Sequence, residues 1–184
     1  MRKIILVLLL ALTLAHPALA WETTAKAVRD GDSIDVMNAD GVQVSIRLYG
    51  VDAPEHKQAY GYQAKNRLKQ LVTGKIIRIE NMDTDRYGRT VALVRLVDGT
   101  LINEEMARSG LAWVYDEYCK EPDLCADLRQ AQAQARSVGR GLWAGSDPIS
   151  PWEWRKRNKT EEWYEKPLRA VKTLARKVRV AIHR

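Results

Sequence analysis

The sequence predicts an α+β fold in which a five-stranded barrel is accompanied by helices and followed by a basic tail. Short runs rich in β-branched residues, bounded by turn-forming residues, fill the first half of the chain. Helical spacing of apolar residues dominates the second half. The 184 residues suffice for one domain with a sizeable core, and nothing in the sequence indicates a second globular unit.

The first 20 residues have the pattern of a secretory signal peptide. Two basic residues precede a mainly apolar run over residues 4–15, and a small-residue signature ends at Ala20. An uncleaved membrane anchor is the weaker alternative, because the run is shorter than the ~20 residues that a bilayer requires. We therefore expect export to the periplasm or the medium, a domain over residues 21–147 and a tryptophan-containing tail over residues 148–184.

Five segments have the composition and the bounding turns of strands. They are residues 23–29, 34–37, 42–49, 75–80 and 90–97. In the third segment Ile46 and Leu48 alternate with polar residues, so one face is apolar and Arg47 projects from the other. This alternation argues against a core position for Arg47.

Three segments have helical spacing, at residues 60–72, 102–109 and 126–138. Glycine residues at 110 and 139 close the second and third segments. Five strands with two or three helices are the content of a small barrel of the oligonucleotide-binding (OB) type. That barrel is the architecture we expect.

Cys119 and Cys125 are the two cysteines of the chain. In a chain with the features of an exported protein, an oxidising compartment favours a disulfide between them. A loop this small would contribute about 2 to 3 kcal/mol of local stabilisation. Metal binding is the weaker alternative, because no histidine or further cysteine lies near to complete a tetrahedral site.

The net charge of +7 is concentrated in the tail. Residues 151–184 hold 11 Lys and Arg against 4 Asp and Glu, whereas residues 21–150 hold 17 against 19. After Pro167, apolar residues at helical spacing are interleaved with basic ones, which predicts a basic amphipathic helix. Three roles are consistent with such a helix: packing on the domain, binding of the nucleic-acid backbone, and contact with an anionic membrane surface. Of the two binding roles we favour nucleic acid.

Two carboxylates in the first half are candidate metal ligands. Asp32 lies in an Asp-Gly-Asp sequence that by itself is most often a simple turn. Asp52 follows the strand that carries Arg47, where a solvated loop is the simpler interpretation. The functional interpretation is that both supply hard oxygen ligands, which suit calcium or magnesium and not zinc.

Arg86 and Arg89 flank Tyr87 and Gly88 in a loop between two predicted strands. As a cluster of charges, this loop would usually be a solvated turn. Phosphoryl chemistry gives a functional alternative, because guanidinium groups stay protonated and donate paired hydrogen bonds to the oxygens on which charge builds. Arg47 and Arg89 are the candidates for this role.

Five segments together resemble the staphylococcal nuclease (thermonuclease) family. They are DGDS at 30–33, RLYGVDAPE at 47–55, DRYGR at 85–89, NE at 103–104 and GLA at 110–112. The likeness extends from about Thr24 to Trp143 with order and spacing kept, so it is more specific than any single motif. The resemblance implies an OB barrel with three helices and calcium-dependent hydrolysis of DNA and RNA that leaves 3′-phosphate ends.

The resemblance also implies a role for each matching residue. Glu55 is expected to be the general base, and Arg47 and Arg89 are expected to stabilise the transition state. The expected calcium ligands are Asp32, Asp52 and the backbone carbonyl of Ala53, and the expected substrate contacts are Arg86, Tyr87 and Tyr115. The family often has threonine at the position of Ala53, a change that a backbone ligand tolerates although the lost hydroxyl alters hydrogen bonding near the metal. For Tyr115, packing is an equally good interpretation.

Two functions of different classes are consistent with these patterns. The first is an exported, monomeric, calcium-dependent nuclease. The second is a catalytically inert OB barrel that binds nucleic acid or a protein. Inert modules generally lose the set of arginines and carboxylates, whereas this chain keeps it, so we expect an enzyme.

Overall fold

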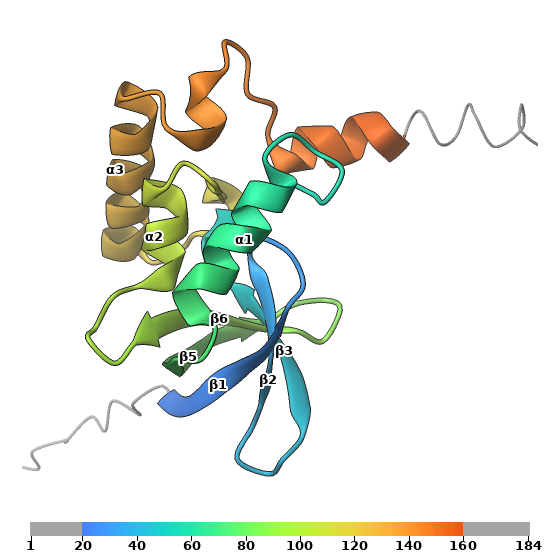
Figure 1. The fold of residues 1–184 in the computed structure, drawn as a ribbon, viewed down its shortest axis with the longest axis vertical. Coiled ribbons are helices and arrows are strands. Elements are labelled where there is room, and N and C mark those ends of the chain that lie inside the picture. Colours follow the sequence, from blue (N-terminus) through green and yellow to red (C-terminus); the bar gives the residue numbers. More distant parts are fainter. Residues whose placement is uncertain (1–19, 160–184) are drawn as a thin grey trace, which may run out of the picture.

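The five predicted strands form a closed barrel (Figure 1). The computed structural model describes residues 20–159, so most of the predicted leader and the predicted amphipathic helix of the tail lie outside the described residues. The strand order is β1-β2-β3-β6-β5. The strands are β1 (Ala20–Val28), β2 (Ser33–Met37), β3 (Gln43–Leu48), β5 (Ile76–Thr84) and β6 (Thr90–Leu96). The predicted α+β class and the OB-type barrel are confirmed.

The barrel closes through β3 and β6, which pair in parallel, whereas its other strand pairs are antiparallel. A parallel pair needs a long connection, and here the chain passes through a helix and β5 before it returns. On β3, Arg47 is opposite Val91 of β6 on one side and opposite Ser33 of β2 on the other. The start of β2, the end of β3 and the loop before β6 therefore meet at one mouth of the barrel.

The three predicted helices are present as α1 (Gly61–Val72), α2 (Ile102–Arg108) and α3 (Pro122–Ser137). The third begins earlier than the predicted residue 126, because proline suits the first turn of a helix. In Figure 1, α2 and α3 lie side by side at the helical end of the molecule. Within residues 20–159, no helix combines the length and the apolar character that crossing a membrane requires.

Several short elements are absent from the sequence prediction. They are β4 (Val51–Asp52), which pairs with β7 (Trp113–Val114), the 3-10 helices η1 (Asp116–Tyr118) and η2 (Gly141–Ala144), and a helix over residues 151–159. Strands of two residues and single helical turns carry no periodicity that a sequence could reveal. The helix over residues 151–159 lies in the predicted tail but packs on the domain, and the division at residue 147 stays a prediction.

A large core fills the barrel and the space beneath the helices, and a smaller cluster of Ala135, Leu142 and Trp143 lies apart from it. The fully buried side chains of the large core include Ile34, Ile46, Leu48, Leu68, Ile77, Ile79, Ile102, Met106 and Leu128. Ile46 and Leu48 are buried on one face of β3, while Arg47 between them is only partly buried. The alternation predicted for this strand is confirmed, and it directs Arg47 away from the apolar core.

A disulfide joins Cys119 and Cys125, as predicted. It connects the residue after η1 with the first turn of α3. The hydroxyl of Tyr49, which follows β3 directly, accepts hydrogen bonds from the N–H groups of Lys120 (2.6 Å) and Glu121 (3.2 Å) in the loop that the disulfide closes. The disulfide loop is thereby attached to the strand that carries Arg47.

Asn103 of α2 holds the other side of this region through three buried hydrogen bonds. Its Oδ1 accepts from the N–H of Val94 at 3.0 Å. Its Nδ2 donates to the carbonyl groups of Tyr49 at 2.9 Å and Ala92 at 3.1 Å. Because Asn103 is fully buried, these bonds fix the residues after β3 to β6 in a place that water does not reach.

We expect Asn103→Ala to lower the free energy of unfolding by about 2 to 4 kcal/mol, because it leaves buried carbonyl and N–H groups without partners. Equilibrium denaturation in urea measures the change. Asn81→Ala, the same substitution at an exposed position of β5, is the matched control and should change stability by less than about 0.5 kcal/mol. Equal stabilities of the two variants would contradict a clamping role for Asn103.

Candidate active site

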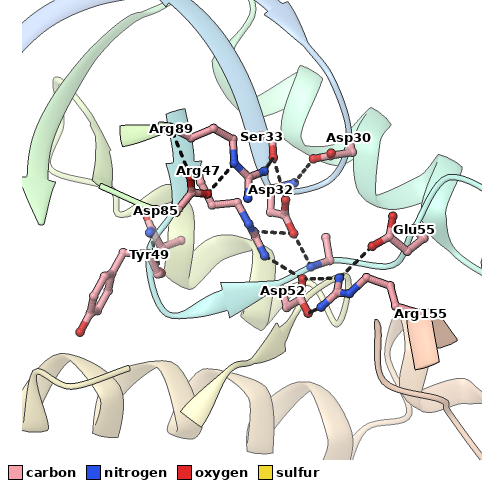
Figure 2. Close-up of polar contacts among 12 residues, drawn as sticks. Asp30, Asp32, Ser33, Arg47, Tyr49, Asp52, Glu55, Asp85, Arg89 and Arg155 are labelled. Atoms are coloured by element: carbon pink, nitrogen blue, oxygen red, sulfur yellow. Dashed lines mark hydrogen bonds and ion pairs between the residues drawn. The ribbon is translucent and has the colours of Figure 1, made fainter. Parts of the chain in front are cut away.

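Four of the predicted site residues meet at the mouth of the barrel where β2 begins and β3 ends (Figure 2). Asp32 directly precedes β2, and Arg47 lies next to the last residue of β3. Asp52 ends β4, and Glu55 follows in the loop that leads to α1. We call Asp32, Asp52 and Glu55 the carboxylate cluster.

Arg47 lies at the centre of the site. Its Nη1 lies 2.6 Å from Oδ2 of Asp32, and its Nη2 donates a 2.7 Å hydrogen bond to Oδ1 of Asp52. The contact with Asp32 is an ion pair without hydrogen-bond geometry, so this buried Nη1 has no hydrogen-bond partner among the described residues. Only 14% of the side chain is exposed. Arg47 therefore neutralises two carboxylates and retains a donor for a further oxygen.

Both carboxyl oxygens of Asp32 are held by donors from nearby residues. Oδ2 accepts a 2.6 Å hydrogen bond from the N–H of Ala53, and Oδ1 accepts a 3.0 Å bond from Oγ of Ser33. Gly31 permits this close approach, because a Cβ at that position would lie 2.6 Å from the Cβ atoms of both Ala53 and Ala64. The glycine of the Asp-Gly-Asp turn thus serves packing as well as the turn.

The environment of Asp32 disfavours its negative charge. Burial raises its pKa to about 7, the positive charge of Arg47 opposes this shift, and the negative charges of Asp30 and Asp52 reinforce it. A carboxyl group in this state gains stability from any further positive charge placed beside it. Electrostatics at Asp32 therefore favour a bound cation.

A third arginine, Arg155 from the helix over residues 151–159, joins Asp52 to Glu55. Its Nη2 is 2.7 Å from Oδ2 of Asp52, and its Nη1 is 3.3 Å from Oδ1 of Asp52 and 2.8 Å from Oε1 of Glu55. The side chain of Asp52 is 1% exposed, whereas that of Glu55 is 42% exposed. Glu55 is thus the member of the carboxylate cluster that solvent reaches.

Gln58 fixes the loop that carries Glu55. The N–H of Glu55 donates to Oε1 of Gln58 at 3.1 Å, and the N–H of Gln58 donates back to the carbonyl of Glu55 at 2.9 Å. The Nε2 of Gln58 donates to the carbonyl of Ile149 at 2.7 Å. This reciprocal pair orients Glu55 and ties its loop to the segment that leads into the helix over residues 151–159.

Arg89 approaches the carboxylate cluster from the loop before β6. Its Nε donates to Oδ2 of Asp85 at 2.7 Å, and its Nη1 lies 3.5 Å from Oγ of Ser33, which donates to Asp32. Burial acts to raise the pKa of Asp85, but hydrogen bonds from Arg89 and from the N–H of Tyr87 lower it. Asp85 therefore stays ionised and holds Arg89 toward the site.

Arg86 and Tyr87 lie at the tip of the same loop, outside the carboxylate cluster. Tyr87 is 71% exposed, and the guanidinium groups of Arg86 and Arg89 lie 4.9 Å and 5.8 Å from the centre of its ring. These distances place both arginines within cation–π range of one tyrosine. The loop thus presents two cationic groups and an aromatic ring next to the site, and the roles expected of Arg86 and Tyr87 stay predictions.

Tyr115 lies in an aromatic group beside the site. Its ring stacks on Trp152 at 5.0 Å with the planes 10° apart, and Tyr118 packs against it at 4.7 Å. Trp113 meets Trp152 edge to face at 5.7 Å. These contacts are those of a packing residue, which was one of the two interpretations of Tyr115, and its role in base stacking stays a prediction.

The atoms suited to a metal are the carboxyl oxygens of Asp32 and Asp52 and the carbonyl oxygen of Ala53. Within residues 20–159, no group of three or more His, Cys, Asp or Glu side chains is arranged to hold a metal ion. This smaller set consists of hard oxygens, which fit calcium or magnesium. Calcium takes about 6 to 8 oxygen ligands, so water and substrate oxygens would complete the set.

Sequence reasoning missed two residues that shape this site, Arg155 and Gln58, and gave no role of its own to Ser33 of the DGDS motif. Arg155 lies in a run of basic residues, WRKRNK at 154–159, and no local pattern distinguishes it from its neighbours. Gln58 contacts the distant Ile149, and Ser33 contacts the distant Arg89. Contacts of this kind form only after the chain folds, so no local pattern predicts them.

Comparisons with known proteins match this chain to one family and to several relatives. Residues 45–145 match the family described as staphylococcal nuclease homologues. The chain is 42% identical to an uncharacterized endonuclease of Escherichia coli O157:H7, with 77% of this chain and 90% of that protein covered. It is 37% identical to an uncharacterized endonuclease of Haemophilus influenzae, with 86% and 88% covered. It is 40% identical to a probable staphylococcal-like nuclease of Oryza sativa subsp. japonica, with 78% of this chain and 48% of that protein covered.

We expect the raised pKa of Asp32 to make the protein less stable as pH rises. Below pH ~4 the carboxyl group is protonated in both the folded and the unfolded chain, and between pH ~4 and ~7 the folded chain alone retains the proton. Relative to Asp32→Asn, wild type should lose unfolding free energy on the order of a few kcal/mol across this range and then level off. Denaturation in chelator at several pH values measures the difference.

Asp35→Asn is the matched control for this experiment. Burial acts to raise the pKa of Asp35, but hydrogen bonds from Arg29 and Ser45 lower it. Its contribution to stability is therefore constant above pH ~4 and is lost only at lower pH. A constant gap between wild type and Asp32→Asn from pH 4 to 7 would contradict the raised pKa.

Proposed function

Because this chain belongs to the family of staphylococcal nuclease homologues and is therefore a nuclease, we propose that it binds calcium, hydrolyses both DNA and RNA to 3′-phosphate ends, and is exported. The observation that supports this proposal most directly is the position of Arg47 between Asp32 and Asp52, with Glu55 at the open side. An inert binding barrel would have no need to hold these charges together at the cost of their desolvation.

Asp32, Asp52 and the carbonyl of Ala53 are the proposed calcium ligands. When bound there, calcium would offset the negative charge that builds on the phosphate oxygens during hydrolysis. Burial is the main reason that the pKa of Asp32 is raised, and the negative charges of Asp30 and Asp52 add to it, so a cation beside this carboxyl group would stabilise its ionised form. The role of the chain's own residues is to hold the scissile phosphate and a water molecule beside this position.

Glu55 is the proposed general base. Its carboxylate takes a proton from water, the water oxygen attacks phosphorus, and the bond to the 5′-oxygen breaks. The departing 5′-oxygen takes a proton from solvent, which leaves a 3′-phosphate and a 5′-hydroxyl group. The exposure of Glu55 supports this role, because a base that acts on water must be reachable by it. Gln58 holds the loop in place and so fixes the carboxylate relative to the barrel.

Arg47 and Arg89 are the proposed stabilisers of the transition state. The Nη1 of Arg47, which is buried and has no hydrogen-bond partner among the described residues, offers a donor to a phosphate oxygen. The Nη1 of Arg89 lies 3.5 Å from Oγ of Ser33, which donates to Asp32, so Arg89 is held next to the site. Arg86 and Tyr87 would contact a neighbouring phosphate from the exposed tip of the loop.

Export and the tail complete the proposal. Cleavage after Ala20 would leave Trp21 as the first residue, and the disulfide between Cys119 and Cys125 suits an oxidising compartment. The basic segment after Pro167 would bind the nucleic-acid backbone, with an anionic membrane surface as its alternative partner. This segment lies outside the described residues. We also propose that the protein acts as a monomer.

Digestion assays test the proposed reaction. We expect the purified protein to degrade single-stranded DNA, double-stranded DNA and RNA in millimolar calcium and to lose this activity in EGTA. The DNA products should resist extension by a polymerase until a phosphatase removes the 3′-phosphate. Activity that persists in chelator would refute the calcium requirement, and products that extend without phosphatase would refute the proposed bond cleavage.

We expect Arg47→Ala and Arg89→Ala to lower kcat by about 10²- to 10³-fold, because each removes a donor to the charge that develops on phosphate. Lysine at either position should restore only part of the rate, since it lacks the paired donors of a guanidinium group. Arg78→Ala, at an exposed position of β5, is the matched control and should keep the wild-type rate. Near-normal turnover of Arg47→Ala or Arg89→Ala would remove that residue from the mechanism.

A further inference from the structure

Arg155 reaches the site from a segment that is anchored on the domain. Ser150 begins the helix over residues 151–159, and its Oγ and the side chain of Glu153 form a capping contact at 3.0 Å. Trp152, in the first turn, stacks on Tyr115. These contacts hold the segment that carries Arg155 against the domain, with its guanidinium group at the edge of the carboxylate cluster.

Asp52 has little acceptor capacity left. Its Oδ1 receives donors from Arg47 at 2.7 Å and from Arg155 at 3.3 Å, and its Oδ2 receives a donor from Arg155 at 2.7 Å. An ionised carboxylate offers about four lone-pair sites in all, so three are taken. A cation that binds Asp52 must share the carboxylate with two guanidinium groups or displace one of them.

The two arginines differ in their freedom to leave. Arg47 is 14% exposed and is held between Asp32 and Asp52 inside the barrel mouth. Arg155 is 38% exposed, and Figure 2 shows it beside Asp52 on the side of Glu55, away from Arg47. Arg155 is thus the more exposed of the two, and the charge of a cation at Asp52 would replace its own, so Arg155 is the group that a cation would displace.

We propose that Arg155 and the divalent cation compete for Asp52, so that Arg155 sets the cation concentration at which the site is filled. This inference rests on the proposed function, since it takes Asp52 as a cation ligand. Two positive groups beside one carboxylate repel each other, and the repulsion is strong in a site where Asp52 is almost fully buried. Arg155 thus holds Asp52 and Glu55 together until a cation replaces it at Asp52.

A purely structural role for Arg155 predicts a different behaviour. Removal of a structural partner would loosen Asp52 and either weaken calcium binding or leave it unchanged. Removal of a competitor strengthens calcium binding. The sign of the change in calcium affinity therefore separates the two roles, and it is measured without reference to activity.

The experiment is a calcium titration by isothermal calorimetry of the wild-type protein, Arg155→Gln and Arg155→Lys. We expect Arg155→Gln to bind calcium about tenfold more tightly than wild type, a coupling typical of two ligands that oppose each other. Arg155→Lys keeps the charge but not the paired donors, so its gain should be smaller. Arg157→Gln removes the same charge from an exposed position of the same helix and should stay within twofold of wild type.

A second measurement uses the wild-type protein alone and covers the case in which Arg155→Gln does not fold. In NMR spectra of arginine side chains, rotation of the Arg155 guanidinium group should be slow in chelator and faster in saturating calcium. An unchanged rotation rate on calcium binding would overturn the competition.

The outcomes separate this inference from the proposed function. Equal or weaker calcium binding by Arg155→Gln, with wild type binding normally, overturns the competition and leaves the proposed calcium site in place. If Arg155→Gln binds calcium and the wild-type protein does not, both the proposed calcium site and the competition are supported. If neither protein binds calcium, the proposed calcium site fails and the competition fails with it.

Discussion

The site depends on the ion pairs that Arg47 makes with Asp32 and Asp52. All three groups are largely removed from water, and each would be costly to bury alone, since loss of one partner from such an arrangement costs about 3 to 5 kcal/mol. The barrel provides the geometry, because the parallel pairing of β3 with β6 and the pairing of β3 with β2 bring Asp32, Arg47 and the loop of Arg89 to one mouth. Fold and site are therefore linked through a single strand.

Around this centre, the supporting contacts come mainly from backbone groups and neutral side chains. Asn103 and Tyr49 fasten the residues after β3 to β6 and to the disulfide loop, and Gln58 fastens the loop of Glu55 to the segment before residue 150. Neutral amide and hydroxyl groups provide direction without adding charge, which leaves the electrostatic balance of the site to its arginines and acids.

The charges are balanced differently at the two aspartates. Asp32 has a raised pKa, chiefly because it is buried and partly because of the negative charges of Asp30 and Asp52. Asp52 instead accepts hydrogen bonds from two guanidinium groups. A cation between the two acids would stabilise the ionised form of Asp32 and would compete with the guanidinium groups at Asp52. The proposed cation site and the proposed competition with Arg155 therefore rest on the same two residues.

The sequence by itself determined the five strands, the three helices, the disulfide and the order of the motifs, because periodicity, turn residues and spacing are local properties of the chain. It also indicated that Arg47 leaves the apolar face of its strand. Only the tertiary structure decided which charges meet: that Arg155 binds Asp52 and Glu55, that Tyr115 stacks on Trp152, and that Gln58 holds the loop of Glu55. The contacts of Arg155 join residues 100 and 103 apart, and Gln58 ties the loop of Glu55 to Ile149, 91 residues further along the chain. Such pairings are set by how the elements pack and leave no periodic trace in the sequence.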